Sequence, residues 1–131
     1  MSLLIDQMLV CEIGQVRYPD GTKIETSTPI GRVLVVESFP ARLNWRVDLR
    51  FTADATSTAT CDVHVVDPRG LRFPPGHLKF VAGPDDDQED IPIPVFTAAV
   101  KGAYAVHLHL NGVPEPALSK EIVIDVAASL A

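Results

Sequence analysis

Hydrophobic and polar residues alternate along much of this chain. The clearest case is "LNWRVDLRFT" (43–52), in which every second residue from Leu43 to Phe51 is apolar and the residues between are polar. Successive side chains of a β-strand point to opposite faces, so this pattern predicts a half-buried antiparallel strand. Trp45 lies in the apolar set, and we expect it in the core.

Two further segments repeat the pattern and carry histidines on the polar side. In "TCDVHVVD" (60–67) Asp62 and His64 alternate with apolar residues, and the segment runs into "DPRG", a type I turn sequence that predicts a hairpin partner near "HLKFVA" (77–82). In "GAYAVHLHLNG" (102–112) the apolar set includes Tyr104, and His107 and His109 lie on the opposite face before an Asn-Gly turn.

Other strands are expected at "MLVCEI" (8–13), "RVLVVES" (32–38), "IPIPVF" (91–96) and "KEIVIDVA" (120–127). The two prolines of "IPIPVF" have no amide hydrogen, so that strand is expected at a sheet edge or is irregular. "TADATSTAT" (52–60) has no large side chain and predicts a mobile surface connection.

These features predict an all-β class. No window has the spacing of a long amphipathic helix, and eleven prolines with eight glycines interrupt the chain at strand-length intervals. We expect a single domain over residues 1–131, an immunoglobulin-like antiparallel β-sandwich of about seven or eight strands or a related Greek-key barrel.

The combination of "FPARLNWRVDLRF", "VHVVDPRG" and "GAYAVHLHLNG" followed by "IVIDV" resembles a group of small bacterial β-sandwich proteins known only as a domain of unknown function. The similarity covers roughly residues 30–127. It implies an immunoglobulin-like fold and assigns neither an activity nor any catalytic residue.

Composition and charge limit the cellular locations and the kinds of partner that we expect. The net charge is −6, but "DDDQED" (85–90) holds five of the seventeen acidic residues, and the rest of the chain is nearly balanced. There is no basic stripe of the kind that nucleic acid requires. The N-terminal segment has neither the basic start of a secretory signal nor a span of about 20 apolar residues, so we expect a cytoplasmic protein without a membrane segment.

The histidines are the main candidate for chemistry. If the two histidine strands are adjacent in one sheet, His64, His107 and His109 emerge on its outer face, close enough to share a zinc ion. Asp62, on the same face, is a candidate fourth ligand or a partner that fixes a ring tautomer. The alternative is that these residues are the solvent side of a sheet, with no cofactor. His77, assigned to a turn, adds nothing to this set.

Other catalytic signals are weak. Cys11 and Cys61 lie among apolar residues and are expected as buried free thiols. Ser38, Ser57 and Ser119 are assigned to turn-like segments without a nearby histidine, and there is no G-x-S-x-G or phosphate-binding glycine motif.

Three classes of function are compatible with this pattern. The first, favoured because a catalytic set is lacking, is a non-catalytic module that acts through protein–protein interaction or self-association, for example as a homodimer. The second is a zinc-binding protein or metal-dependent enzyme that uses the His64/His107/His109 face. The third is a structural subunit of a bacterial or phage assembly.

Overall fold

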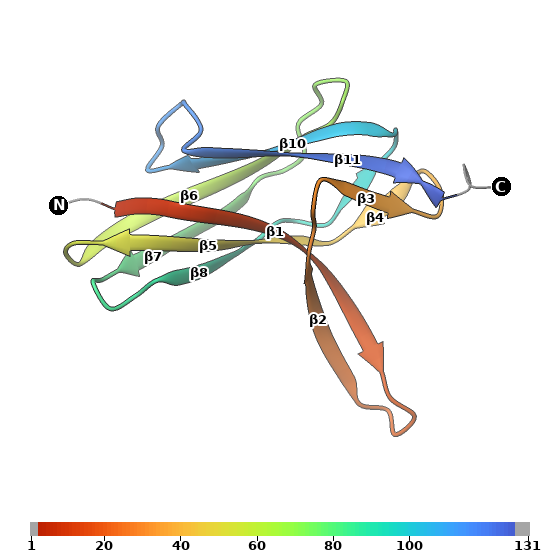
Figure 1. Cartoon of the computed structure of the whole chain (residues 1–131), viewed down its shortest axis with the longest axis horizontal. Coiled ribbons are helices and arrows are strands. Elements are labelled where there is room, and N and C mark those ends of the chain that lie inside the picture. The colour runs from red at the N-terminus through yellow and green to blue at the C-terminus, as the bar shows by residue number, and fades with distance from the viewer. Residues whose placement is uncertain (1–2, 128–131) are drawn as a thin grey trace.

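The computed structural model describes residues 3–127, and these form an all-β molecule of eleven strands in three sheets (Figure 1). In chain order the strands are β1 (Leu3–Arg17), β2 (Lys23–Pro29), β3 (Val33–Val36), β4 (Ala41–Leu43), β5 (Trp45–Ala53), β6 (Ser57–Val66), β7 (Gly76–Ala82), β8 (Gln88–Pro92), β9 (Phe96–Ala98), β10 (Gly102–Leu110) and β11 (Leu118–Val126). The all-β class predicted from the alternation is confirmed, whereas the expected count of seven or eight strands is too low. Part of the excess lies in β4 and β9, which have only three residues each, and in β2, for which no strand was expected.

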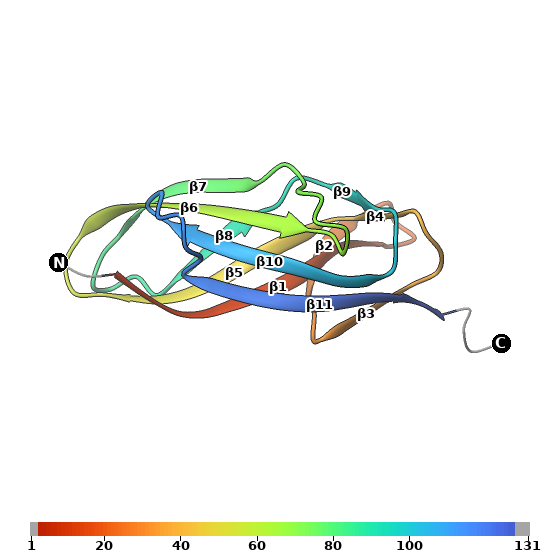
Figure 2. The ribbon, with the colours of Figure 1, turned by 90° about the horizontal axis from the view of Figure 1, so that it is seen from above.

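Two larger sheets form the layers of the molecule. One has the order β2-β1-β5-β8 and the other the order β3-β11-β10-β6-β7, while β4 and β9 form a small third sheet. All pairs are antiparallel except β3 with β11, which run parallel. Figure 2 looks down on the five-stranded sheet, with β1 and β5 passing beneath it. The three sheets include a curled half-barrel.

The core lies between these two layers, where the alternation predicted it. Along β5 the residues Trp45, Val47 and Leu49 are fully buried, and along β10 the same holds for Tyr104 and Leu108. The Trp45 ring meets the Phe96 ring edge-on, with centroids 4.9 Å apart. Trp45 and Tyr104 are therefore core residues, as their register predicted.

The segment "TADATSTAT" is not the surface connection that its composition indicated. β6 begins at Ser57, and Ala59 is 1% exposed. Ala59 lies directly opposite Phe80 on β7. The Phe80 ring also contacts the Phe51 ring, at a centroid distance of 5.6 Å. A large side chain on the neighbouring strand fills the space beside the small one, so this strand needs no large residues of its own.

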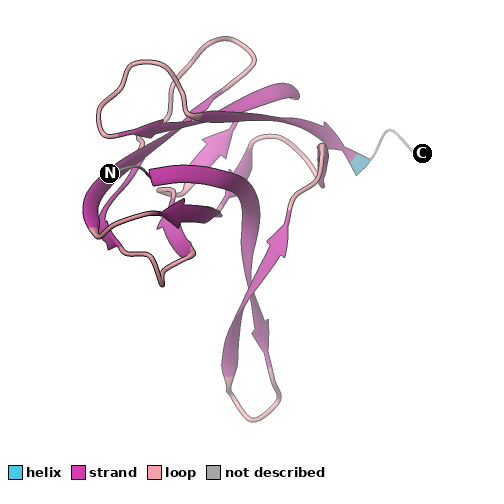
Figure 3. Cartoon of the chain, turned by 60° about the vertical axis from the view of Figure 1, so that its left-hand side comes forward, coloured by secondary structure: helices cyan, strands magenta, loops and turns pink. Residues whose placement is uncertain are grey.

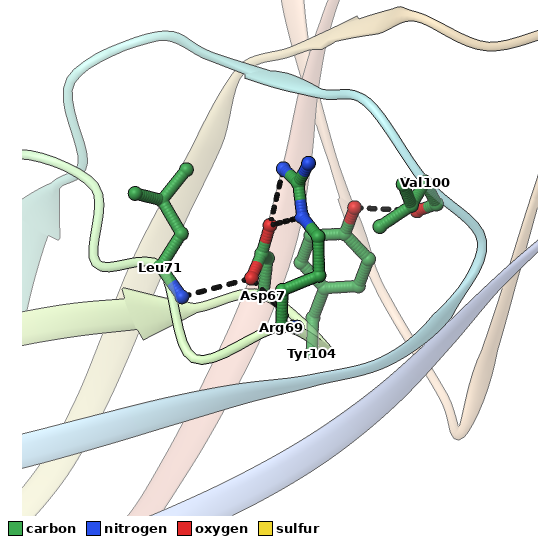
Figure 4. Close-up of polar contacts among 5 residues, drawn as sticks. All are labelled: Asp67, Arg69, Leu71, Val100 and Tyr104. Atoms are coloured by element: carbon green, nitrogen blue, oxygen red, sulfur yellow. Dashed lines mark hydrogen bonds and ion pairs between the residues drawn. The ribbon is translucent and has the colours of Figure 1, made fainter.

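The predicted "DPRG" turn is built around a buried carboxylate (Figure 4). Asp67 is 4% exposed, and its Oδ1 accepts hydrogen bonds from the backbone amides of Arg69 (2.8 Å) and Leu71 (2.9 Å). Its Oδ2 accepts from the Arg69 guanidinium at 2.7 and 2.9 Å. Beside this turn the Tyr104 hydroxyl donates to the Val100 carbonyl at 2.6 Å.

The N-terminal strand is much longer than the six residues expected at "MLVCEI". Beyond its last pair with β5, Glu12↔Trp45, β1 continues and pairs only with β2. Residues 13–27, named the arm below, therefore project from the body of the molecule as a two-stranded hairpin (Figures 1 and 3).

The proline-containing segment is irregular and lies only partly at an edge: Ile91 and Pro92 belong to β8, residues 93–95 lie in no strand, and Phe96 begins β9. β8, which ends at Pro92, is the outer strand of the four-stranded sheet and pairs only with β5. The "HLKFVA" segment forms most of β7 and pairs antiparallel with β6, so the predicted hairpin partner is confirmed.

Candidate functional site

Polar side chains of the five-stranded sheet gather on its outer face, opposite the core. β10 lies between β6 and β11, and β7 flanks β6. The register places residues in two adjacent rows. This group, named the histidine face, consists of Ser119, His107 and His64 in one row and His109, Asp62 and His77 in the other.

The predicted residues His64, His107, His109 and Asp62 therefore occupy neighbouring positions. His107 is directly opposite His64, and His109 is directly opposite Asp62. The ring contact, however, joins a diagonal pair: the His64 and His109 centroids are 5.2 Å apart with the ring planes at 82°.

His107 is engaged in a different contact from the other two histidines. Its Nδ1 lies 2.7 Å from Oγ of Ser119 on β11. The assignment of Ser119 to a turn without a nearby histidine was thus wrong, because the strand begins at Leu118. Within residues 3–127 the other His107 ring nitrogen has no hydrogen-bond partner, so no third group orients the ring as in a catalytic triad.

His77 belongs to this face, and its assignment to a turn was wrong. It is the second residue of β7, directly opposite Asp62, and its Nδ1 donates to Asp62 Oδ1 at 2.6 Å. The sequence already contained a signal for placing His77 on this strand, because the predicted hairpin partner "HLKFVA" starts at His77. Pro74 and Pro75 interrupt the pairing after the turn, so the register could not be counted from the turn alone.

His109 has a fixed tautomer. Its Nδ1 lies 3.1 Å from the carbonyl oxygen of Val113. Because a carbonyl only accepts, the hydrogen is on Nδ1 and the neutral ring keeps a lone pair on Nε2.

The surroundings of His64 favour its neutral form. Partial burial lowers the pKa of His64, and the neighbouring His109, Arg72 and His107 lower it further, whereas Asp62 raises it. The net pKa lies below the usual value of 6.5, so the ring is predominantly neutral at pH 7.

A shallow depression of about 400 Å³ opens beside these rings. It is lined by Asp62, His64, Arg72, His109, Gly112, Val113 and Pro114. A second open depression, of about 570 Å³, lies near β3 and β11 and is lined by Arg32, Val33, Ser119, Lys120, Glu121 and Val123.

Across residues 3–127, no group of three or more His, Cys, Asp or Glu side chains is arranged to hold a metal ion. The zinc site at His64, His107, His109 and Asp62 stays a prediction. Cys11 and Cys61 are buried free thiols and take no part in the face. No helix in the described part of the chain is long and apolar enough to cross a membrane.

Two solved structures on which the chain superposes belong to larger proteins. The chain superposes on Trichoderma reesei β-D-glucoside glucohydrolase with a TM-score of 0.51 and 12% identity, covering 94% of this chain and 19% of that one. It superposes on Pseudomonas fluorescens alkylpurine DNA glycosylase AlkC, bound to DNA containing an abasic site analog, with a TM-score of 0.49 and 18% identity, covering 94% and 30%. The chain thus spans less than a third of either protein, and at these identities the likeness concerns the fold alone.

No protein-family model and no curated protein sequence matches the chain. Structural similarity supports a small all-β domain, and the resemblance to the bacterial β-sandwich group stays a prediction.

Proposed function

We propose that this chain is a non-catalytic β-module that binds another protein through its arm, residues 13–27. The observation that supports this is a set of three apolar side chains on the projecting hairpin. Val16, Tyr18 and Ile24 are 42%, 48% and 47% exposed, and the hairpin that carries them projects beyond the two packed sheets (Figure 1). A two-stranded hairpin is marginally stable alone in water, so a partner that covers this part of it lowers its free energy.

The arm is amphipathic. Val16 pairs directly with Ile24, and Tyr18 continues the same side of the alternation. The other side carries the pairs Arg17↔Lys23 and Gln15↔Glu25. Glu25 accepts a hydrogen bond from the Arg46 guanidinium of β5 at 2.6 Å, so the polar side is tied to the body and the apolar side is the one left for a partner.

The edge of the arm indicates what kind of partner it binds. β2 is the outer strand of its sheet and pairs only with β1, so within the described chain its second edge has unpaired backbone groups. Three half-exposed side chains provide far less than the roughly 800 Å² per partner of a stable interface. An extended segment of another protein fits better than a second copy, because it adds backbone hydrogen bonds along β2 to the burial of Val16 and Ile24.

The experiment is selection of peptides from a random library against the purified chain, followed by NMR mapping and calorimetry. We expect the bound peptide to shift resonances of residues 13–27. The double substitution Val16→Thr/Ile24→Thr, which keeps β-branched side chains, should weaken binding about tenfold or more. The matched control is Val33→Thr/Val35→Thr, since these β3 valines are 56% and 57% exposed.

Two results would overturn the proposal. One is peptide binding that maps to β3, β7 or β8 and is unchanged in the arm variant. The other is a concentrated chain that is dimeric by light scattering and becomes monomeric in the arm variant, which would identify a second copy as the occupant of the arm.

The immunoglobulin-like interpretation of the fold is part of this proposal. It is supported by two facing sheets around Trp45 and by the Tyr104 hydroxyl, which donates to a carbonyl four residues upstream as in the tyrosine corner of Greek-key sandwiches.

A structural role in a larger assembly and a cytoplasmic location also stay predictions. Light scattering over a concentration series tests the first of these, because a subunit that polymerises shows a mass that rises with concentration.

A further inference from the structure

We propose that His64 and His109 form a two-histidine site for a transition-metal ion such as zinc, with the depression beside them supplying room for water ligands. This narrows the predicted set, because it leaves His107 out of the ligands and gives Asp62 a supporting role. It is independent of the arm, which lies on a different sheet.

The first argument is the separation of the rings. Two imidazoles that share a tetrahedral zinc at a Zn–N distance of about 2.0–2.1 Å have ring centroids roughly 5 Å apart. The His64 and His109 centroids are 5.2 Å apart. The rings meet edge to face, with their planes at 82°, so one ring must turn about its Cβ–Cγ bond before a nitrogen of each ring faces one ion.

The second argument is the state of the nitrogens. The Val113 carbonyl holds the hydrogen of His109 on Nδ1, which leaves Nε2 with a lone pair in the neutral ring. His64 makes no side-chain hydrogen bond with any residue from 3 to 127, so either of its nitrogens is able to bind. His107 differs in this respect, because its Nδ1 contacts Ser119.

The third argument is the surroundings of the pair. The depression of about 400 Å³ opens directly on both rings, which suits an ion whose remaining ligands are water molecules. The Asp62 carboxylate, which His77 already orients at 2.6 Å, lines the same depression and can accept a hydrogen bond from such a water. Arg72 also lines it and opposes a dication, so the site is expected to be weaker than a four-ligand structural zinc site.

The test is titration of the full chain with zinc chloride, followed by calorimetry and by NMR of the histidine ring protons. We expect one zinc per chain, with the largest shifts at His64 and His109. His64→Gln and His109→Gln should each weaken binding by about tenfold or more.

His107→Gln is the matched control, because His107 is directly opposite His64 in the register but contacts Ser119. His107→Gln should change the zinc affinity by no more than about twofold relative to the wild type. This is well below the tenfold loss expected when a ligand is removed. Failure of the wild-type chain to bind zinc overturns the proposal. So does a loss in His107→Gln or His77→Gln as large as that in His109→Gln. Far-ultraviolet circular dichroism of each variant distinguishes lost binding from lost folding.

Discussion

The Tyr104 hydroxyl donates a hydrogen bond to the carbonyl oxygen of Val100, four residues earlier in the chain, at 2.6 Å. Tyr104 is 0% exposed, so its ring is held in the core while its hydroxyl ties down the loop that leads into β10. Burial raises the pKa of Tyr104, so the neutral hydroxyl is the donor at physiological pH.

Tyr104→Phe should therefore destabilise the fold without changing its core. The substitution removes one buried hydrogen bond and leaves a carbonyl without its partner, which costs about 1–2 kcal/mol of unfolding free energy. Urea denaturation followed by tryptophan fluorescence measures the loss. An unchanged denaturation midpoint would show that the hydroxyl contributes nothing to stability.

The buried Asp67 carboxylate should make the protein sensitive to acid. Burial raises the pKa of Asp67, but its hydrogen bonds with Leu71 and Arg69 outweigh this effect, so the net pKa lies below the usual value of 3.8. A carboxyl whose pKa is depressed in the folded state contributes stability above its unfolded pKa, and this contribution is lost as pH falls through the folded pKa. Asp67→Asn should flatten this part of the stability profile, as measured by urea midpoints between pH 5 and pH 2.

The control for Asp67 is Asp85→Asn, because Asp85 is exposed and its side chain makes no hydrogen bond with any residue from 3 to 127. We expect that variant to keep the steep acid limb of the wild type, because this carboxylate has no hydrogen bond to lose on unfolding. Equal flattening in both variants would contradict a specific role for Asp67.

His64 should produce a second pH dependence, at higher pH. Its folded pKa is depressed below 6.5, so the unfolded chain binds a proton more readily than the folded chain. The contribution of this group to stability is complete above about pH 6.5 and is lost as pH falls through the folded pKa. Urea midpoints from pH 8 to pH 5 should fall, and by less in His64→Gln. A His64→Gln profile identical to the wild type would contradict this.

Both cysteines should be unreactive in the folded protein. Burial raises the pKa of Cys61 to about 11, with a further rise from Asp62, so the thiolate that attacks alkylating reagents is scarce at pH 8. Cys11 is 5% exposed. Thiol titration at pH 8 should give slow labelling in buffer and rapid labelling of both cysteines in denaturant. Rapid labelling of either cysteine in buffer would show that its strand opens readily.

Alternation predicted the burial of individual residues well because it is a local property of a strand. It identified Trp45 and Tyr104 as core residues and placed His107 and His109 away from Leu108, which is fully buried. It did not reveal β4 and β9, whose three-residue strands are too short to show a period. It also did not reveal that Ala59 is buried, because the side chain that covers it belongs to another strand.

The histidine face, too, was predicted only in part from the sequence. The sequence predicted that His64, His107, His109 and Asp62 share one face, and the register confirms their proximity. The addition of His77 and Ser119 depended on how β7 and β11 pair with their neighbours. The ring contact of His64 with His109 rather than with His107 depended on side-chain partners from other strands, namely Ser119 and the Val113 carbonyl.

By itself the sequence determined the all-β class and which side of each major strand is apolar, since both follow from the spacing of neighbouring residues along one strand. The tertiary structure decided that β1 and β2 extend into a projecting arm and which imidazoles meet on the outer face. Strand pairing and register depend on residues far apart in the chain, and their energies come from contacts that no single segment contains.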